Sequence, residues 1–129
     1  MPVCQESDEV IQTFIKAYRE GDVDTLADLY HVDAVLYNID GISRGRDEIR
    51  AAWQGFADRF EVLDYNVLQR EEESLGDYAF GHMTMSALLR ERGAADPFTV
   101  HARSTEITRR GADGGWRFVV DHASVEIPK

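Results

Sequence analysis

The sequence is poor in cysteine and in basic charge, and it has no long apolar run. Cys4 is the only cysteine among 129 residues, so no disulfide can form within the chain and a reducing compartment is expected. With 14 Lys and Arg against 24 Asp and Glu, the net charge of -10 would repel a nucleic-acid backbone. No apolar run approaches the roughly 20 residues that a membrane-spanning helix needs, and MPVCQESDEV at the start does not resemble a signal peptide. We therefore expect a cytoplasmic protein that binds neither nucleic acid nor membrane.

The residues that are present predict one domain, 1–129, with a hydrophobic core. The 43% hydrophobic and 29% charged residues are ordinary for a globular protein. Apolar residues at three- and four-residue spacings predict an amphipathic helix that is capped by Ser7 and ends at Gly21. Asp22 or Asp24 would cap a second, shorter helix. Its buried side would consist of Leu26, Leu29 and Tyr30.

Strand patterns dominate the rest of the chain. Residues 34–39 are rich in β-formers and end at the Asp40-Gly41 turn, which predicts a strand. The helical period returns from Arg46 to about Arg59. Short breaks then separate four long segments of strand-like composition, which predicts an antiparallel meander. The four segments are Glu61 to Glu73, Tyr78 to Arg90, Phe98 to Arg109 and Trp116 to Ile127.

The last of these strands carries apolar residues on both faces. Strict alternation puts Phe118 and Val120 on one face with His122, and Val119 on the other. Three helices can cover only one side of a sheet with strands this long. The second apolar face therefore predicts a homodimer through the outer face of the sheet.

The order of these elements resembles a known group of proteins. With GRDEIRAAW from Gly45 to Trp53 after the first strand, and GGWRFVVDHAS at the end, nearly the whole chain is similar to the SnoaL-like families of the nuclear transport factor two-like, or cystatin-like, superfamily. It resembles ketosteroid isomerase homologues most closely and the association domain of calcium/calmodulin-dependent kinases more distantly. The resemblance implies an α+β fold: three N-terminal helices packed on a strongly curved, mostly antiparallel sheet, forming a cone-shaped half barrel with an internal pocket. It also implies dimerisation through the outer sheet face.

Steroid isomerisation is not implied, because the resemblance breaks down at the catalytic residues. The catalytic tyrosine of that pattern falls on Phe14, which has no hydroxyl to stabilise a dienolate. Its general-base aspartate falls on Asn38, which does not exchange a proton near neutral pH. Asp40, two residues on, could substitute if the turn bends it inward. The protonated aspartate of the third strand falls near Arg103 or Ser104, with no carboxyl at either position.

Three histidines, at 82, 101 and 122, lie on successive predicted strands. Imidazoles that converge in a pocket could bind zinc, but the sequence has neither HxxxH nor HxH spacing, and no metal site is predicted. His122 could act as a general acid or base, or it could be a hydrogen-bonded interface residue. His82 is a candidate ligand-binding residue.

Arg103 and Asp121 form a second candidate group. If the final hairpin places Arg109 near Arg117, Arg103 and Asp121 share a sheet face as diagonal neighbours. Arg103 could then hold a ligand carboxylate, or the two could form a salt bridge that only satisfies a charge. A register shift of one residue would put them on opposite faces, with Arg103 facing His122 instead.

Aromatic residues supply the remaining candidates. Trp53 and Tyr37 could line a pocket for a flat apolar ligand or belong to the core, and Tyr18, one helical turn after Phe14, could supply a displaced phenol. No phosphate-binding glycine loop and no activated nucleophile is recognisable.

Two functions remain open at this stage. The first is a small-molecule pocket protein, which as an enzyme would be a cofactor-free isomerase, cyclase or hydratase. In that case Asp40 or Asp121 would move a proton and Arg103 would bind an oxygen of the ligand. The second is a non-catalytic oligomerisation or partner-binding module, which predicts a cone filled by side chains.

Overall fold

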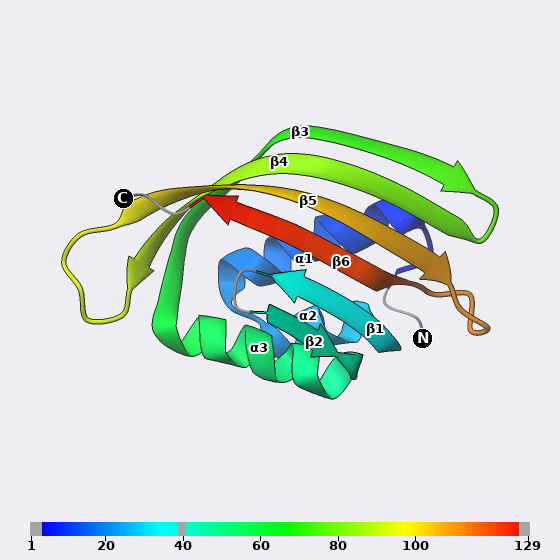
Figure 1. Cartoon of the computed structure of the whole chain (residues 1–129), viewed down its shortest axis with the longest axis horizontal. Helices are drawn as coiled ribbons and strands as arrows, with labels where there is room; N and C mark the ends of the chain where they lie inside the picture. Colours follow the sequence, from blue (N-terminus) through cyan, green and yellow to red (C-terminus); the bar gives the residue numbers. More distant parts are fainter. Residues whose placement is uncertain (1–3, 39–40, 127–129) are drawn as a thin grey trace.

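The structure is a computed structural model that describes residues 4–38 and 41–126. Asp40, one of the predicted proton-transfer residues, lies outside the described residues. The helices are α1 (Ser7–Glu20), α2 (Val23–Asp28) and α3 (Gly45–Arg59). The strands are β1 (Tyr30–Asn38), β2 (Gly41–Arg44), β3 (Phe60–Leu75), β4 (Tyr78–Glu91), β5 (Phe98–Arg110) and β6 (Trp116–Glu126), all shown in Figure 1.

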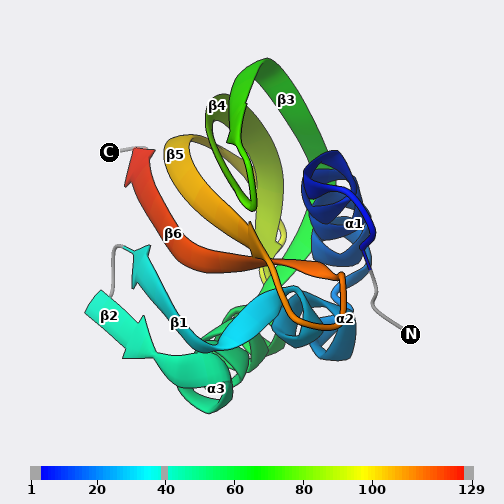
Figure 2. The ribbon, with the colours of Figure 1, turned by 90° about the vertical axis from the view of Figure 1, so that its right-hand side faces the viewer.

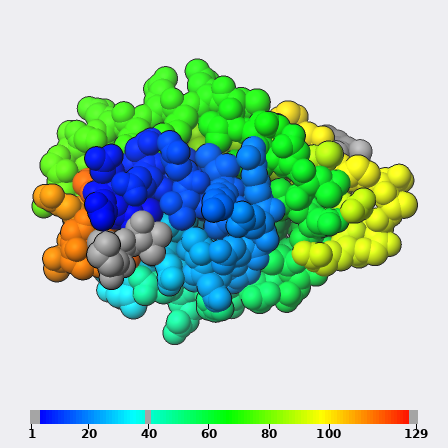
Figure 3. Space-filling view, turned by 180° about the vertical axis from the view of Figure 1, so that it is seen from behind, coloured from blue at the N-terminus to red at the C-terminus, as the bar shows by residue number. Residues whose placement is uncertain are grey.

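The strands form one curved sheet in the order β2-β1-β6-β5-β4-β3. Neighbouring strands are antiparallel except β1 and β6, which are parallel. Figures 1 and 2 show the sheet bending around the three helices, which lie on its concave side. In the view of Figure 3, α1 and α2 (blue) lie across the surface beside β3 (green). The predicted fold class, an α+β cone with a mostly antiparallel sheet, is therefore confirmed.

Capping explains where the first two helices begin and end. α1 ends at Gly21, whose φ of 68° lies in the left-handed region that glycine adopts at little steric cost. α2 starts after Asp22, whose side chain accepts a hydrogen bond from the Thr25 backbone N–H at 3.1 Å, so Asp22 is the cap and Asp24 is not. The predicted cap at Ser7 is wrong: Ser7 is the first helical residue, and its hydroxyl donates to Glu72 of β3 at 2.7 Å.

The first strand starts earlier than predicted. Tyr30, assigned from the sequence to the second helix, is the first residue of β1 and is fully buried. The Arg46 guanidinium donates to the Tyr30 carbonyl oxygen from Nε at 2.9 Å and from Nη2 at 2.7 Å, which ties the start of β1 to α3. β2 was not predicted, because its four residues show no apolar alternation.

The last hairpin contains a β-bulge that the sequence pattern does not show. Thr108 of β5 pairs with Phe118 of β6, whereas Ile107 pairs with Val120, so Val119 has no partner on β5. One extra residue in a strand moves every later residue of that strand to the opposite face of the sheet. Phe118 and Asp121 are consequently both buried, while Val120 lies on the other face, and the predicted face shared by Phe118 and Val120 is wrong.

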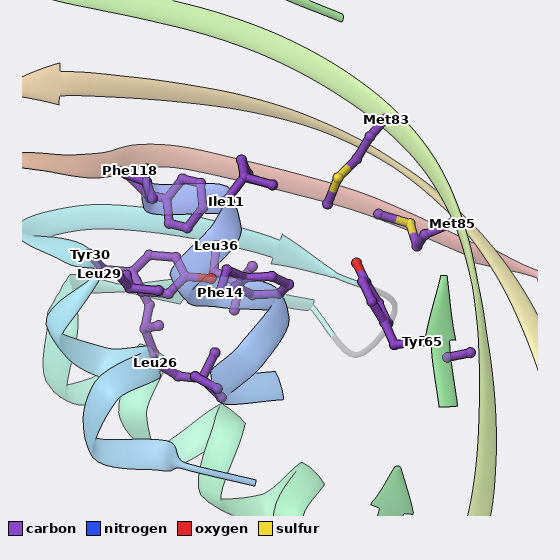
Figure 4. Close-up of a cluster of buried hydrophobic side chains, with 14 of the residues drawn as sticks. Ile11, Phe14, Leu26, Leu29, Tyr30, Leu36, Tyr65, Met83, Met85 and Phe118 are labelled. Atoms are coloured by element: carbon purple, nitrogen blue, oxygen red, sulfur yellow. The ribbon is translucent and has the colours of Figure 1, made fainter. Parts of the chain in front are cut away.

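The core fills the concave side between the sheet and the helices. Phe14 of α1 packs edge-on against Phe118 of β6, with ring centroids 6.1 Å apart. Figure 4 shows Met83, Met85 and Tyr65 facing this aromatic group across the interior. Unbranched methionine side chains adapt their shape readily, so this side of the core is more deformable than the aromatic side.

Gly81 of β4 provides a test of the sheet packing. A Cβ at this position would lie 2.8 Å from the Glu71 carbonyl oxygen of β3, a backbone atom that cannot move aside freely. We expect Gly81→Ala to lower the unfolding free energy by about 1–3 kcal/mol, measured by urea denaturation. Gly55→Ala is the matched control. In α3 a Cβ at Gly55 meets nothing within 4 Å, so this variant should be unchanged or up to about 1 kcal/mol more stable. Equal effects of the two substitutions would contradict the described packing.

Candidate functional site

Two carboxyl side chains lie opposite each other on the concave face of the sheet. Glu106 of β5 pairs with Asp121 of β6, and directly opposite residues point to the same face. On its other side Glu106 pairs with Gly81 of β4, which in turn pairs with Glu72 of β3. We call Glu72, Gly81, Glu106 and Asp121 the carboxyl row. Glu106 and Asp121 are only 5% and 6% exposed, so two acidic groups are held side by side away from water.

Asp121 is held by a chain of two aromatic side chains. The Tyr30 hydroxyl donates to Asp121 Oδ2 at 2.7 Å. The Trp53 indole N–H of α3 donates to the Tyr30 hydroxyl oxygen at 3.3 Å. These bonds connect a helix on one side of the interior to a carboxyl group on the sheet, and they fix the orientation of Asp121.

Glu106 is less well satisfied. Within residues 4–38 and 41–126, Glu106 Oε2 and Ser104 Oγ are both buried and neither meets the geometry of a hydrogen bond, although the Ser104 hydroxyl is close enough to Glu106 to lower the pKa of its carboxyl. Ser104 lies two residues before Glu106 and therefore on the same face. A cavity of about 10 Å³ beside Glu106 and Gly81 has about the space that one water needs. Because a buried polar atom without a partner is costly, this part of the row is suited to accept a polar atom of a ligand or a water.

Burial raises the pKa of both carboxyl groups. Desolvation, with the charge of Asp121 as the second cause, raises the pKa of Glu106 to about 7. Desolvation also raises the pKa of Asp121 to about 6, although the Tyr30 hydrogen bond and the charge of His122 act to lower it. Neighbouring carboxyls in a poorly hydrated site repel each other when both are ionised, so the pair retains a proton near neutral pH. One group can then donate a proton while the other accepts one.

A larger cavity of about 240 Å³ lies where the ends of α1 and α3 meet the start of β3. Its wall combines aromatic and aliphatic side chains with four charged ones. The apolar side chains that line it are those of Tyr18, Leu26, Trp53, Phe56, Ala57, Phe60 and Val62. The charged ones are Arg19, Glu20, Glu61 and Arg92. Such a lining could hold the apolar body and a polar group of a small organic molecule.

One layer of aromatic side chains separates this cavity from the carboxyl row. Trp53 lines the cavity and also bonds Tyr30, the residue that bonds Asp121. Tyr18 also lines the cavity, and its ring centroid lies 4.8 Å from that of Tyr65. Desolvation raises the pKa of both Tyr18 and Tyr65, so both phenols stay protonated and can act only as hydrogen-bonding groups at neutral pH.

Some of the residues predicted from the sequence lie in this region. Tyr18 and Trp53 line the cavity, and Asp121 lies in the carboxyl row. Asn38 is the last residue of β1, half-buried and engaged with other residues.

Four other predicted residues lie on the convex face. His122 faces Thr105 in the ladder and is exposed, as are His82 and Arg103. Tyr37 pairs with His122, and their ring centroids are 5.4 Å apart.

Of the two registers considered for Arg103 and Asp121, the shifted one is confirmed and the shared face is wrong. Arg103 pairs with Ser124 on the convex face, whereas Asp121 pairs with Glu106 on the concave face. The hairpin does place Arg109 opposite Arg117, as assumed. The bulge at Val119, however, shifts the pairing of all later residues of β6 with β5 by one residue.

Two residues of the candidate site, Glu106 and Tyr30, were not recognised from the sequence. Glu106 lies two residues after Ser104, the position at which no carboxyl could be matched. The sequence does contain an indication of Glu106: it is an acid on the strand face that it shares, by alternation, with Val100, Ser104 and Thr108. These three residues are buried. Tyr30 was missed as a site residue because it was assigned to the apolar side of a helix.

The described ranges hold no group of three or more His, Cys, Asp or Glu side chains that could bind a metal. His82, His101 and His122 are each exposed on the convex face. None of the described helices combines the length and the apolarity that crossing a membrane requires.

Comparison with known proteins gives a consistent result. The profile of the SnoaL-like domain family matches residues 8–128, which is most of the chain. The sequence matches no curated protein.

Solved structures with the same fold have low sequence identity. A ketosteroid isomerase-like protein from Erwinia carotovora atroseptica SCRI1043 has a TM-score of 0.82 and 16% identity, over 94% of each chain. A proposed dehydratase of the NTF2-like family from Streptomyces avermitilis has a TM-score of 0.80 and 20% identity, also over 94% of each chain. A proposed calcium/calmodulin dependent protein kinase II association domain from Xanthomonas campestris has a TM-score of 0.79 and 22% identity, over 93% of this chain and 85% of that one. At these identities the similarity shows the fold alone.

The raised pKa values predict an unusual pH dependence of stability. Because the folded protein holds these protons more tightly than the unfolded chain, the pair makes the unfolding free energy fall as pH rises from about 4 to about 7. We expect Glu106→Gln to be more stable than the wild type by roughly 1–3 kcal/mol at pH 8, and about equal to it at pH 4. Urea denaturation at both pH values measures this difference. Glu73→Gln, at an exposed position of β3, is the matched control. A Glu106→Gln effect that does not change with pH would contradict the burial of an ionisable pair.

Proposed function

We propose that this chain, which belongs to the SnoaL-like domain family, binds a small organic ligand and performs cofactor-free proton transfer on it. The observation that supports this most strongly is the carboxyl pair. Glu106 and Asp121 are buried opposite each other, and their pKa values are higher than those of ordinary surface carboxyls. A surface salt-bridge network does not need such an arrangement, whereas acid–base catalysis at neutral pH does.

In this proposal the ionised member of the pair takes a proton from a carbon of the ligand, and the protonated member delivers a proton to an oxygen or to another carbon. Transfer to another carbon is an isomerisation, and loss of a protonated hydroxyl as water is a dehydration. Asp121, which is oriented by Tyr30, is the proposed base. Glu106 is the proposed acid, and the buried Ser104 hydroxyl beside it would bind the ligand oxygen. The ketosteroid isomerase-like and dehydratase names of two structural neighbours accord with this chemistry.

The 240 Å³ cavity supplies the binding site for the body of the ligand. For the ligand to reach the carboxyl row, Trp53 would have to release Tyr30, which breaks the 3.3 Å hydrogen bond between them while the Tyr30 bond to Asp121 is kept. Met83, whose ladder partner is Ser104, can change rotamer to make room beside the row. Tyr18 would stay in the cavity wall and contact the ligand.

Proton transfer to and from carbon is tested by isotope exchange. The ligand is first identified by native mass spectrometry of protein purified from its own host, and it is then incubated with the protein in D₂O. We expect deuterium to enter the ligand at a carbon position, and we expect Asp121→Asn to slow this exchange by about 10²–10⁴-fold. Asp33→Asn, at an exposed position of β1, should leave the rate unchanged. If the wild type exchanges no faster than buffer, the protein is a binding module and the catalytic proposal fails.

We also propose that two copies associate through the convex face of the sheet, in the cytoplasm. Four apolar side chains cross this face in one ladder row, which we call the convex apolar row: Phe80, Ile107, Val120 and Val35. The row crosses β4, β5, β6 and β1, and Phe80 is 40% exposed. An apolar stripe of this kind, on the face of the sheet opposite the three described helices, is favourable for association of two copies. A non-catalytic oligomerisation module is the second candidate function, and it would use this same row; a structural neighbour named as a kinase association domain accords with it.

The dimer is tested by one substitution at the centre of the row. We expect the wild type to sediment as a dimer at micromolar concentration and Ile107→Lys to sediment as a folded monomer, because the substitution places a charge in the apolar contact. Val32→Lys, at an apolar side chain that is 57% exposed and outside the row, is the control and should stay dimeric. A monomeric wild type would overturn the proposal.

A further inference from the structure

Two arginines and two glutamates line the 240 Å³ cavity, and a third arginine outside the lining pairs with one of the glutamates, although the chain as a whole has a net charge of -10. Arg19 belongs to the last turn of α1, and Arg92 follows the end of β4. Both line the cavity, together with Glu20 and Glu61. The pairing of these four side chains determines which charge a ligand would meet.

Glu61 is already neutralised. Its Oε1 accepts hydrogen bonds from Arg90 Nη2 at 2.6 Å and from Arg90 Nε at 3.2 Å. The two arginines at the mouth are held differently, since each donates to a neutral backbone carbonyl. Arg19 Nη2 donates to the Tyr65 carbonyl oxygen, and Arg92 Nε donates to the Ala57 carbonyl oxygen at 2.9 Å.

The two guanidinium groups are therefore oriented without being neutralised. Within residues 4–38 and 41–126, neither Arg19 nor Arg92 forms an ion pair with a carboxylate. Glu20 is the only lining carboxylate in those ranges that lacks a basic partner, so two cations face one anion. Each guanidinium keeps N–H donors that its carbonyl partner does not use, and these match the geometry of a carboxylate.

The rest of the cavity restricts the size and shape of the ligand. Its volume of about 240 Å³ is below the roughly 300–1,000 Å³ of sites for drug-sized ligands, which restricts the body to one or two rings. In the wall, the rings of Trp53 and Phe56 are edge-on to each other, with their centroids 5.8 Å apart. The ring centroids of Phe56 and Phe60 are 5.4 Å apart. Such a wall packs against a flat apolar body.

From these observations we infer that the cavity takes a flat ligand of one or two rings that carries a carboxylate or similar anionic group, with the rings against Trp53 and Phe56 and the anion at Arg19 and Arg92. This inference rests on the proposed function, which names the cavity as the binding site, and it adds the chemical class of the ligand. The anion would anchor one end of the ligand at the mouth while the other end points towards Trp53 and the carboxyl row behind it.

A matched pair of probes separates the effect of the ligand's negative charge from the binding of its ring body in the cavity. 2-Naphthoate and 2-naphthamide have the same ring body and differ in the anionic group. We expect isothermal titration calorimetry to show that the wild type binds 2-naphthoate about tenfold more tightly than 2-naphthamide, with the preference decreasing as salt is raised. Arg92→Gln should reduce the preference to about threefold or less, and Arg92→Lys should retain part of it because the charge remains but the planar fork does not. Arg44→Gln, at an exposed side chain that does not line the cavity, makes the same change in net charge and should leave the preference intact.

The possible failures are distinguishable. Binding of both probes with equal affinity, or tighter binding of the amide, would overturn the anionic ligand class while leaving the proposed cavity in place. A preference for 2-naphthoate that survives both Arg92→Gln and Arg19→Gln would overturn the assignment of the anion to the mouth. If neither probe binds, the cavity is not a ligand site, and the proposed function fails together with the inference.

Discussion

The register between β5 and β6 is the constraint on which the site depends. Because Val119 bulges out of the ladder, Asp121 points to the concave face and meets Glu106, and Phe118 keeps its place in the core. Without the extra residue, the alternation of a regular strand would send Asp121 to the convex face whenever Phe118 is buried. A single unpaired residue thus allows an apolar core strand to carry a buried acid three positions later.

Burying two carboxyls next to each other is unfavourable in itself, and the surrounding structure only partly offsets it. Asp121 receives the Tyr30 hydroxyl, and Tyr30 is held in turn by Trp53, while the Tyr30 carbonyl is bound by Arg46. Glu106 has weaker support: its Oε2 forms no hydrogen bond of normal geometry within the described residues, although the nearby Ser104 hydroxyl and the charge of Arg70 act to lower the pKa of its carboxyl. Incomplete satisfaction of a buried polar group is the pattern expected where a ligand completes the network, because stability is given up locally for function.

Much of the fold could be predicted from the sequence, because the signals are local. Helical periodicity and the cap at Asp22 place the helices, and strand composition with short turns places the four long strands. The site could be predicted only in part. The candidates from the sequence include Asp121, Trp53 and Tyr18. The face on which Asp121 lies, however, depends on a bulge that no residue type in WRFVVDHAS indicates. The pairing with Glu106 is a contact between strands, and sequence alternation alone does not determine the register that creates it.

The most direct test of the account is a titration of the carboxyl carbons of Glu106 and Asp121 by ¹³C NMR, with assignments made from Glu106→Gln and Asp121→Asn. We expect both carboxyls to titrate well above the ordinary range for Asp and Glu of about 4, with midpoints near 7 for Glu106 and near 6 for Asp121, and we expect the removal of one carboxyl to shift the titration of the other. Two independent titrations near pH 4 would show that the carboxyls are hydrated and uncoupled, and would contradict both the buried pair and the acid–base function built on it.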